Sequence, residues 1–177
     1  KKVEIKDLGS LESLTLALDK NKIDLLMSGL DITKKRQKKM YMVKYTSVSI
    51  TKLYLMFWGE PKVKSLQDFR NLENNTVCVE SGSQCVSFLD WPEYNYLSTK
   101  PIPGVPEMVL EIKFGKSSAM VLEPGAAKDV LKKYPQIKYI IIDIPKELQI
   151  PGAGIGIKQN NTNLINDIKK AIDIIKK

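Results

Sequence analysis

Apolar positions along the chain switch between helical and strand spacing. Leu11, Leu14, Ala17 and Leu18 recur at intervals of three and four, which predicts a helix, and the apolar run at residues 23–27 predicts a strand. Further strands are predicted at residues 48–58, 76–80, 118–122, 139–144 and 152–157, and further helices at 84–89, 106–114, from 124, and at 164–175. Strands and helices that alternate in this way indicate an α/β protein.

Two of the predicted strands have unusual compositions. The run at residues 139–144 is almost continuously apolar, which is typical of a strand buried on both faces. The strand at residues 152–157 reads GAGIGI, which does not match the GxGxxG fingerprint, and no Gly-rich loop ends in GK[ST]. The sequence therefore offers no support for nucleotide binding.

Polar residues follow the first predicted strand. Ser28 and Gly29 close it, and Asp31, Thr33 and Arg36 come next. Ligands of open α/β sheets bind at the carboxyl ends of strands, where Asp31 could receive a cation and Arg36 an anion. Alternatively, the segment from Asp31 to Thr33 caps a basic turn and Arg36 is a solvated charge, and spacing alone favours this second interpretation.

Two other strand ends show the same arrangement. The strand at 76–80 leads through Ser81, Gly82 and Ser83 into a helix, an order that can present backbone N–H groups to an anion. An ordinary strand-to-helix loop fits these residues equally well. Glu123 follows the strand at 118–122, where it either belongs to a site or caps the helix that begins near Pro124.

Composition narrows the classes of function. The chain has 177 residues, of which 43% are hydrophobic and 27% charged, as in ordinary soluble globular proteins. The net charge of +8 comes almost wholly from scattered lysines, which argues against a nucleic-acid partner. No apolar run approaches the ~20 residues of a membrane span, and no signal-peptide pattern is present, so we expect a cytoplasmic or an already processed chain.

The absence of histidine removes several kinds of chemistry. No His is available for a metal site or for a His-based catalytic triad, so neither a metal nor another cofactor is expected. Cys78 and Cys85 match neither a CxxC redox pair nor a zinc cluster. They could pair in an oxidising compartment or remain as two buried thiols, and the sequence leaves both possibilities open.

Four motifs in order carry a resemblance to a known family. They are KIDLLMSGLDITKKR at 22–36, VCVESGSQ at 77–84, SSAMVLEPGAA at 117–127 and GAGIGI at 152–157, followed by a closing helix. Together they resemble the bacterial periplasmic solute-binding proteins for polar amino acids, family 3, and GLDIT and the LEP turn are similar to the arginine-binding members. The resemblance spans nearly the whole chain.

The resemblance implies a two-lobed periplasmic-binding-protein fold of type II, which closes over one amino acid. We expect lobe I at residues 1–55 and 152–177, lobe II at residues 56–151, and two crossover hinge strands near 53–58 and 145–153. The N-terminal part of lobe I and the C-terminal tail of the family are expected to be absent from this chain.

In lobe I, the resemblance assigns the ligand's charged groups to two side chains. Arg36 would hold the α-carboxylate in a two-pronged contact, together with a backbone N–H near Asp31. Asp31 would face the α-ammonium group, and the carbonyl at Ser28 and Gly29 would accept another of its hydrogens.

In lobe II, the matching positions complete the expected site. A backbone N–H at Ser83 would contact the carboxylate, and Glu123 would face the α-ammonium group from the side opposite Asp31. Glu80 and Gln84 match positions that reach the ligand side chain. The ligand's charges would be satisfied only in the closed state, and such differential affinity drives hinge closure.

The resemblance therefore predicts the substrate-binding component of an ABC importer. Its ligand would be a polar or basic L-amino acid, arginine first, and its partner a membrane permease. We expect a monomer in the periplasm or at the extracytoplasmic cell surface, with lipid anchoring left open and no catalytic residue.

Two alternatives use the same fold. A periplasmic enzyme similar to dehydratases would need Glu80 or Glu123 with a raised pKa in a dry cleft. The effector-binding domain of a regulator would normally adjoin a DNA-binding helix-turn-helix, which this chain does not contain.

Overall fold

The structure is a computed structural model that describes residues 3–46 and 49–176. The chain divides into two compact units. Unit 1 comprises Lys1–Ser49 and Ile150–Lys177, and unit 2 comprises Ile50–Gln149. Unit 1 is therefore built from both ends of the chain. The expected lobe boundaries at 55/56 and 151/152 and the two expected hinge strands stay a prediction.

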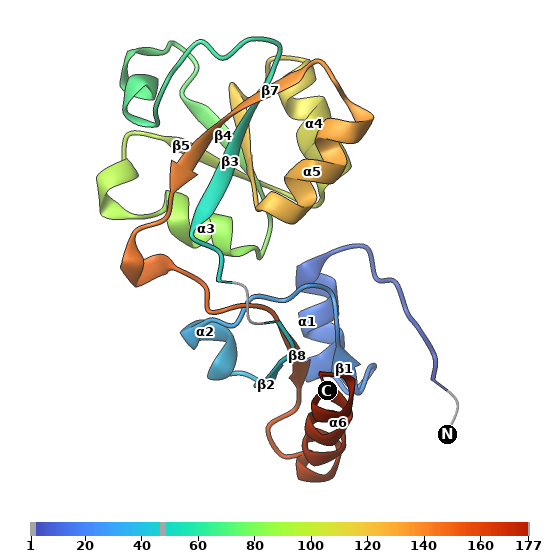
Figure 1. The fold of residues 1–177 in the computed structure, drawn as a ribbon. Helices are drawn as coiled ribbons and strands as arrows, with labels where there is room; N and C mark the ends of the chain where they lie inside the picture. The colour runs from blue at the N-terminus through green and yellow to red at the C-terminus, as the bar shows by residue number, and fades with distance from the viewer. Residues whose placement is uncertain (1–2, 47–48, 177) are drawn as a thin grey trace. The chain divides into compact units, whose positions relative to one another are not determined.

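The described residues of unit 1 form an antiparallel sheet in the order β1-β8-β2 together with the helices α1, α2 and α6 (Figure 1). The bounds are α1 Leu11–Asp19, β1 Leu25–Leu26, α2 Lys34–Gln37, β2 Tyr41–Lys44, β8 Gly154–Ile157 and α6 Thr162–Ile175. A cluster that includes Leu18 and Leu26 packs α1 against β1, and a second cluster packs Ile165 of α6 against Ile155 and Ile157 of β8.

Both predicted helices of unit 1 are confirmed, whereas the strands differ in detail from the prediction. The first predicted strand is reduced to the two residues of β1, and β2 was not predicted as a strand. In α6, Leu164, Ile168 and Ile172 pack on the cluster with Ile165, but Ala171 and Ile175 are exposed. The covered part of this helix therefore ends at Ile172.

Unit 2 is built on a five-stranded sheet in the order β5-β4-β6-β3-β7 (Figure 1). Strand β4 runs parallel to β5 and β6, and β3 runs antiparallel to β6 and β7. The strands are β3 Lys52–Trp58, β4 Thr76–Glu80, β5 Ser98–Ile102, β6 Ala119–Leu122 and β7 Ile137–Asp143. The helices are η1 Gln67–Asn71, α3 Gln84–Leu89, η2 Pro92–Tyr94, α4 Val105–Lys113, α5 Pro124–Lys133 and η3 Lys146–Leu148, where η marks a 3₁₀ helix.

The sheet of unit 2 is covered on both faces. Because side chains alternate along a strand, Leu55 and Phe57 of β3 join a buried cluster with Phe88 of α3. Met56 points to the other face and joins a cluster with Met108 of α4. Helix α3 therefore covers one face, and α4 and α5 cover the other (Figure 1). The predicted α/β class is confirmed.

Strand β7 corrects a prediction. Its apolar run was expected to be buried on both faces, but Tyr139 is 42% and Ile141 50% exposed. Both side chains lie on the same face of β7, and at this edge of the sheet that face extends beyond the helices that cover the central strands. Tyr139 covers part of its surface by packing on Tyr54, with ring centroids 4.7 Å apart.

Strand β5 lies at the opposite edge and was not predicted. Its sequence contains Lys100 and Pro101, and proline is tolerated in a strand at a sheet edge, where a missing N–H leaves no partner unsatisfied. The predicted strand at 48–58 is confirmed from Lys52 onward, and Val48 lies outside the described residues.

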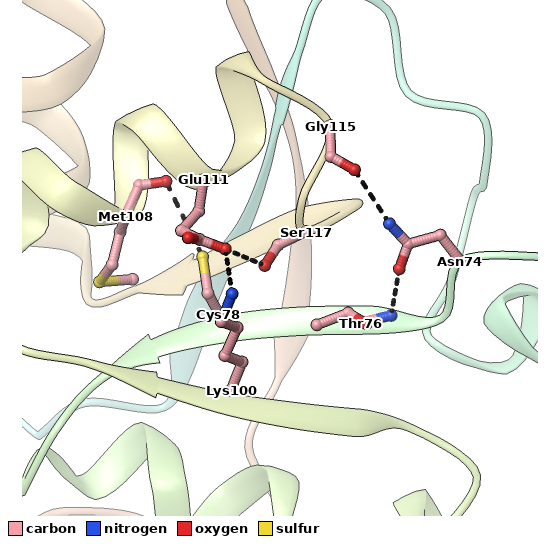
Figure 2. Close-up of polar contacts among 8 residues, drawn as sticks. All are labelled: Asn74, Thr76, Cys78, Lys100, Met108, Glu111, Gly115 and Ser117. Atoms are coloured by element: carbon pink, nitrogen blue, oxygen red, sulfur yellow. Dashed lines mark hydrogen bonds and ion pairs between the residues drawn. The ribbon is translucent and has the colours of Figure 1, made fainter.

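A polar cluster joins β5, α4 and the loop before β6 in unit 2 (Figure 2). Lys100 Nζ lies 2.7 Å from Glu111 Oε2, and the hydroxyl of Ser117 donates to the same oxygen at 3.2 Å. The hydrogen bond from Lys100 is the main cause that holds the pKa of the Glu111 carboxyl below its usual range. Next to this cluster, the Sγ of Cys78 lies 3.8 Å from the carbonyl of Met108.

Cys78 is a buried free thiol, so it is not bridged to Cys85. Burial raises its pKa to about 12, which keeps the group protonated at neutral pH. A protonated thiol is a poor nucleophile. Of the two possibilities left open by the sequence, the structure therefore contains buried thiols and no disulfide between these cysteines.

Replacing Glu111 by Gln is expected to lower the free energy of unfolding by about 1 kcal/mol at pH 7, because the partly buried pair with Lys100 is lost. The pKa of Glu111 is lowered in the folded state, so its stabilisation is present above the ordinary value of 4.5 and is lost as the pH falls. Urea unfolding should show a difference from the parent that narrows below that pH. The exposed pair of Lys132 and Asp129 provides the control, since Asp129→Asn should change little.

Candidate functional site

The segment that follows β1 forms an exposed turn. Met27, Ser28 and Gly29 are exposed, and Gly29 has a φ of +67°, a conformation that side-chain-bearing residues rarely adopt. Leu30 then points into the cluster under α1. The turn thereby leads the chain from the edge strand to Asp31.

Asp31 is held against the start of the β8 segment. It forms an isolated antiparallel bridge with Ala153, next to a hydrogen bond from the Ile32 N–H to the Gly152 carbonyl at 3.0 Å. On the other side, the Gly154 N–H donates to the Leu30 carbonyl at 2.8 Å. These backbone contacts bury Asp31 to 4% exposure, which is unusual for a carboxylate.

Arg36 is brought to Asp31 by helix α2. The hydroxyl of Thr33 caps this helix and accepts from the Arg36 backbone N–H at 3.2 Å. The side chain turns back, so that Arg36 Nη1 donates to the Asp31 carbonyl at 2.9 Å and lies 3.7 Å from Asp31 Oδ2. The two side chains are only 14% and 6% exposed. A pair of charges so far removed from water contributes little net stability, because the loss of hydration offsets most of the attraction between them.

The glycines at the start of β8 explain how this segment fits, and sequence reasoning missed them. A Cβ at Gly154 would lie 3.0 Å from Ile32 Cγ1, and one at Gly156 would lie 2.6 Å from Met40 Sδ. Ile155 and Ile157 belong to the cluster with α6. The sequence does show a glycine at every second residue from 152 to 156. This spacing indicates a strand with one face free of side chains, which lets a neighbouring segment approach closely.

In unit 2, the predicted residues gather at one edge of the sheet. Glu80 is the last residue of β4, and Glu123 follows β6 as the N-cap of α5. Since β4 and β6 are parallel neighbours with Cys78 opposite Met120, their carboxyl ends meet at the same edge. Open α/β sheets bind ligands there.

The turn between β4 and α3 carries the other predicted residues. Ser83 is the N-cap of α3, and Gln84 is the first residue of this helix. The backbone N–H of Ser83 donates to the Glu80 carbonyl at 3.1 Å. The N–H that was expected to contact the ligand carboxylate is therefore already engaged within the turn, whereas the Ser83 hydroxyl oxygen is buried and has no hydrogen-bond partner among the described residues.

The candidate residues therefore fall into two sets, one in each unit. The set of unit 1 is Ser28, Gly29, Asp31 and Arg36, and the set of unit 2 is Glu80, Ser83, Gln84 and Glu123. Within unit 1 the structure brings Asp31 and Arg36 into contact, whereas Ser28 and Gly29 lie in the exposed turn before them. Their individual roles stay predictions.

Two further features concern the described residues only. Within residues 3–46 and 49–176, no His, Cys, Asp and Glu side chains gather in groups of three or more that could hold a metal ion. None of the helices in this part of the chain combines the length and the apolar character needed to cross a membrane.

The full length of the chain, residues 1–177, matches the family of bacterial extracellular solute-binding proteins, family 3. The chain belongs to this family, and the expected family resemblance is confirmed. The members are binding proteins for solutes.

Curated relatives of similar sequence are arginine-binding proteins. The probable ABC transporter arginine-binding protein ArtJ of Chlamydia trachomatis is 31% identical over 169 residues, which cover 95% of this chain and 63% of ArtJ. The arginine-binding extracellular protein ArtP of Bacillus subtilis is 25% identical over 96% of this chain and 64% of ArtP. The chain thus spans somewhat less than two thirds of the length of these relatives.

Solved structures agree on the fold. An ancestral arginine-binding protein bound to glutamine matches 99% of this chain and 74% of its own length with a TM-score of 0.82 and 25% identity. A Salmonella typhimurium periplasmic binding protein with high arginine specificity matches 95% of this chain and 73% of its own length, with a TM-score of 0.84 and 18% identity. The predicted two-lobed periplasmic-binding-protein fold is thereby confirmed as the fold class.

Proposed function

We propose that the chain binds a polar or basic L-amino acid, with arginine as the preferred ligand, as the substrate-binding component of an ABC importer. The observation that carries this proposal is the nearly dehydrated pair of Arg36 and Asp31 in unit 1. A zwitterion needs one cationic and one anionic partner about as far apart as its own two charges, and this pair supplies both. The arginine-binding relatives support the choice of ligand.

In this proposal, each group of the ligand has a partner of matching chemistry. The guanidinium of Arg36 takes the α-carboxylate, and Asp31 takes the α-ammonium group. The buried hydroxyl of Ser83 donates to the carboxylate, while Glu123 adds negative charge for the ammonium group. Glu80 and Gln84 are then left for the basic side chain, for which a carboxylate and an amide oxygen are suitable acceptors.

Membership of the family supports a wider role. The units correspond to the two lobes, which we place at residues 1–55 with 152–177 and at 56–151, and the ligand drives their closure because it binds groups of both. The chain would act as a monomer in the periplasm or at the extracytoplasmic cell surface and deliver the amino acid to a membrane permease. No residue takes a catalytic role, and no cofactor is required.

Thermal unfolding in the presence of each of the twenty amino acids tests this proposal. A ligand at about 100 times its Kd adds about 2.7 kcal/mol to the stability, which for a chain of this size raises the Tm by about 5–10 °C. We expect the largest shift with L-arginine and smaller shifts with lysine and glutamine. Unchanged melting with all twenty would contradict the proposed function, and D-arginine controls for effects of salt and charge.

A further inference from the structure

Residues 152 and 153, which pair with Asp31 and Ile32, also contact the end of strand β2 on their opposite side. The ladder between β2 and β8 ends at the pair of Lys44 and Gly154. Beyond it, the Ala153 carbonyl accepts from the Tyr45 N–H at 3.2 Å, and the Ala153 N–H donates to the hydroxyl of Thr46 at 2.9 Å. The Thr46 N–H donates to the same carbonyl at 3.5 Å, so the backbone and the side chain of Thr46 both contact Ala153, and the hydroxyl is the acceptor of the Ala153 N–H.

Gly152 makes this arrangement sterically tight. Its φ is +130°, and a Cβ there would lie 2.7 Å from the Thr46 carbonyl oxygen and 3.0 Å from Thr46 Oγ1. The backbone of Gly152 therefore lies directly against Thr46, while its carbonyl accepts from the Ile32 N–H. Residues 152 and 153 connect Thr46 on one side with Asp31 and Ile32 on the other, all within unit 1.

We propose that Thr46 is a positioning residue of the amino-acid site, whose hydroxyl fixes Ala153 and, through residues 152 and 153, the buried carboxylate of Asp31. The part of this inference that concerns the ligand rests on the proposed function. Without the hydroxyl, the Ala153 N–H loses its acceptor and the bridge to Asp31 loosens in the free protein. Binding must then order this bridge again, which weakens affinity although Thr46 itself does not contact the ligand.

Three variants separate the hydroxyl from the shape of the side chain. Thr46→Val keeps the branched shape and removes the hydroxyl, and Thr46→Ser keeps the hydroxyl. Thr15→Val is the matched control, because Thr15 in α1 of the same unit donates its hydroxyl to the Leu11 carbonyl at 2.8 Å. Each variant is compared with the parent by amide hydrogen exchange without ligand and by titration with L-arginine.

For Thr46→Val we expect the Ile32 amide to exchange up to about tenfold faster and the Kd for L-arginine to rise about five- to tenfold, as befits the loss of one hydrogen bond. Amides of α6 should keep their protection. Thr46→Ser should stay within about twofold of the parent in both measurements, since its hydroxyl can still accept the hydrogen bond from the Ala153 N–H. Thr15→Val should leave the Ile32 amide and the Kd unchanged.

The inference is overturned if Thr46→Val resembles Thr15→Val in both measurements, or if Thr46→Ser loses protection at Ile32 despite its hydroxyl. Faster exchange with unchanged affinity would overturn the link to the ligand. If Thr46→Val does not fold, Thr46→Ala replaces it as the variant without the hydroxyl. The comparison of Thr46→Ala with Thr46→Ser then tests whether the hydroxyl is required. A parent chain that binds no arginine would contradict the proposed function while leaving the exchange comparison intact.

Discussion

Replacing Arg36 by Lys is expected to weaken L-arginine binding by about 100-fold or more, although the charge is kept. A guanidinium presents a planar fork that can donate two parallel hydrogen bonds to a carboxylate, whereas an ammonium group is a point charge. Loss of a charge-assisted hydrogen bond removes about 1.5–3 kcal/mol, and 1.4 kcal/mol corresponds to a factor of ten. The Lys side chain is also too short to keep the contact with the Asp31 carbonyl that now positions the guanidinium at 2.9 Å.

The chain offers a matched control for this substitution. Arg70 lies in unit 2, where its guanidinium carbon is 4.4 Å from the centre of the Tyr96 ring. Arg70→Lys changes the same chemical group away from the candidate residues, so it should leave the Kd unchanged within about twofold. Isothermal titration of both variants provides the measurement. Affinity of Arg36→Lys equal to that of the parent would show that Arg36 is only a structural charge paired with Asp31.

The elements with regular spacing could be predicted from the sequence. The helix α1 and the sequence from β4 to α3 were predicted because their apolar spacing and their turn residues agree. The edge strands were predicted less well. The apolar run of β7 predicts a strand buried on both faces, and the polar sequence of β5 with its proline predicts no strand, since neither pattern reveals that a strand lies at the edge of the sheet.

The candidate site was predicted in part for a similar reason. Asp31 and Arg36 lie five residues apart at the end of a strand, so local spacing places them near each other, and the structure adds that Asp31 is buried and the Arg36 side chain mostly so. The hydrogen bond between Ala153 and Thr46 joins residues 107 positions apart, and no local pattern indicates it. The alternating glycines of β8 were visible in the sequence, but their partner became evident only from the packing of Ile32 and Met40.

Agmatine is expected to bind at least about 100-fold more weakly than L-arginine. It keeps the guanidinium side chain and an amine but lacks the α-carboxylate, so its binding leaves Arg36 without the partner proposed for it. Agmatine and the Arg36→Lys variant thus remove the same contact, that between the guanidinium of Arg36 and the α-carboxylate, one by changing the ligand and the other by changing the protein. In the Arg36→Lys variant the preference for arginine over agmatine should therefore shrink to less than about tenfold, because two changes that remove one interaction are not additive.

Calorimetric titration of the parent chain with L-arginine and then with agmatine is the most direct measurement of an amino-acid site built on Arg36 and Asp31. We predict saturable binding of L-arginine at a stoichiometry of about one, and binding of agmatine that is weaker by about 100-fold, or about 2.7 kcal/mol. Equal affinity for the two ligands, or no binding of either, would contradict such a site.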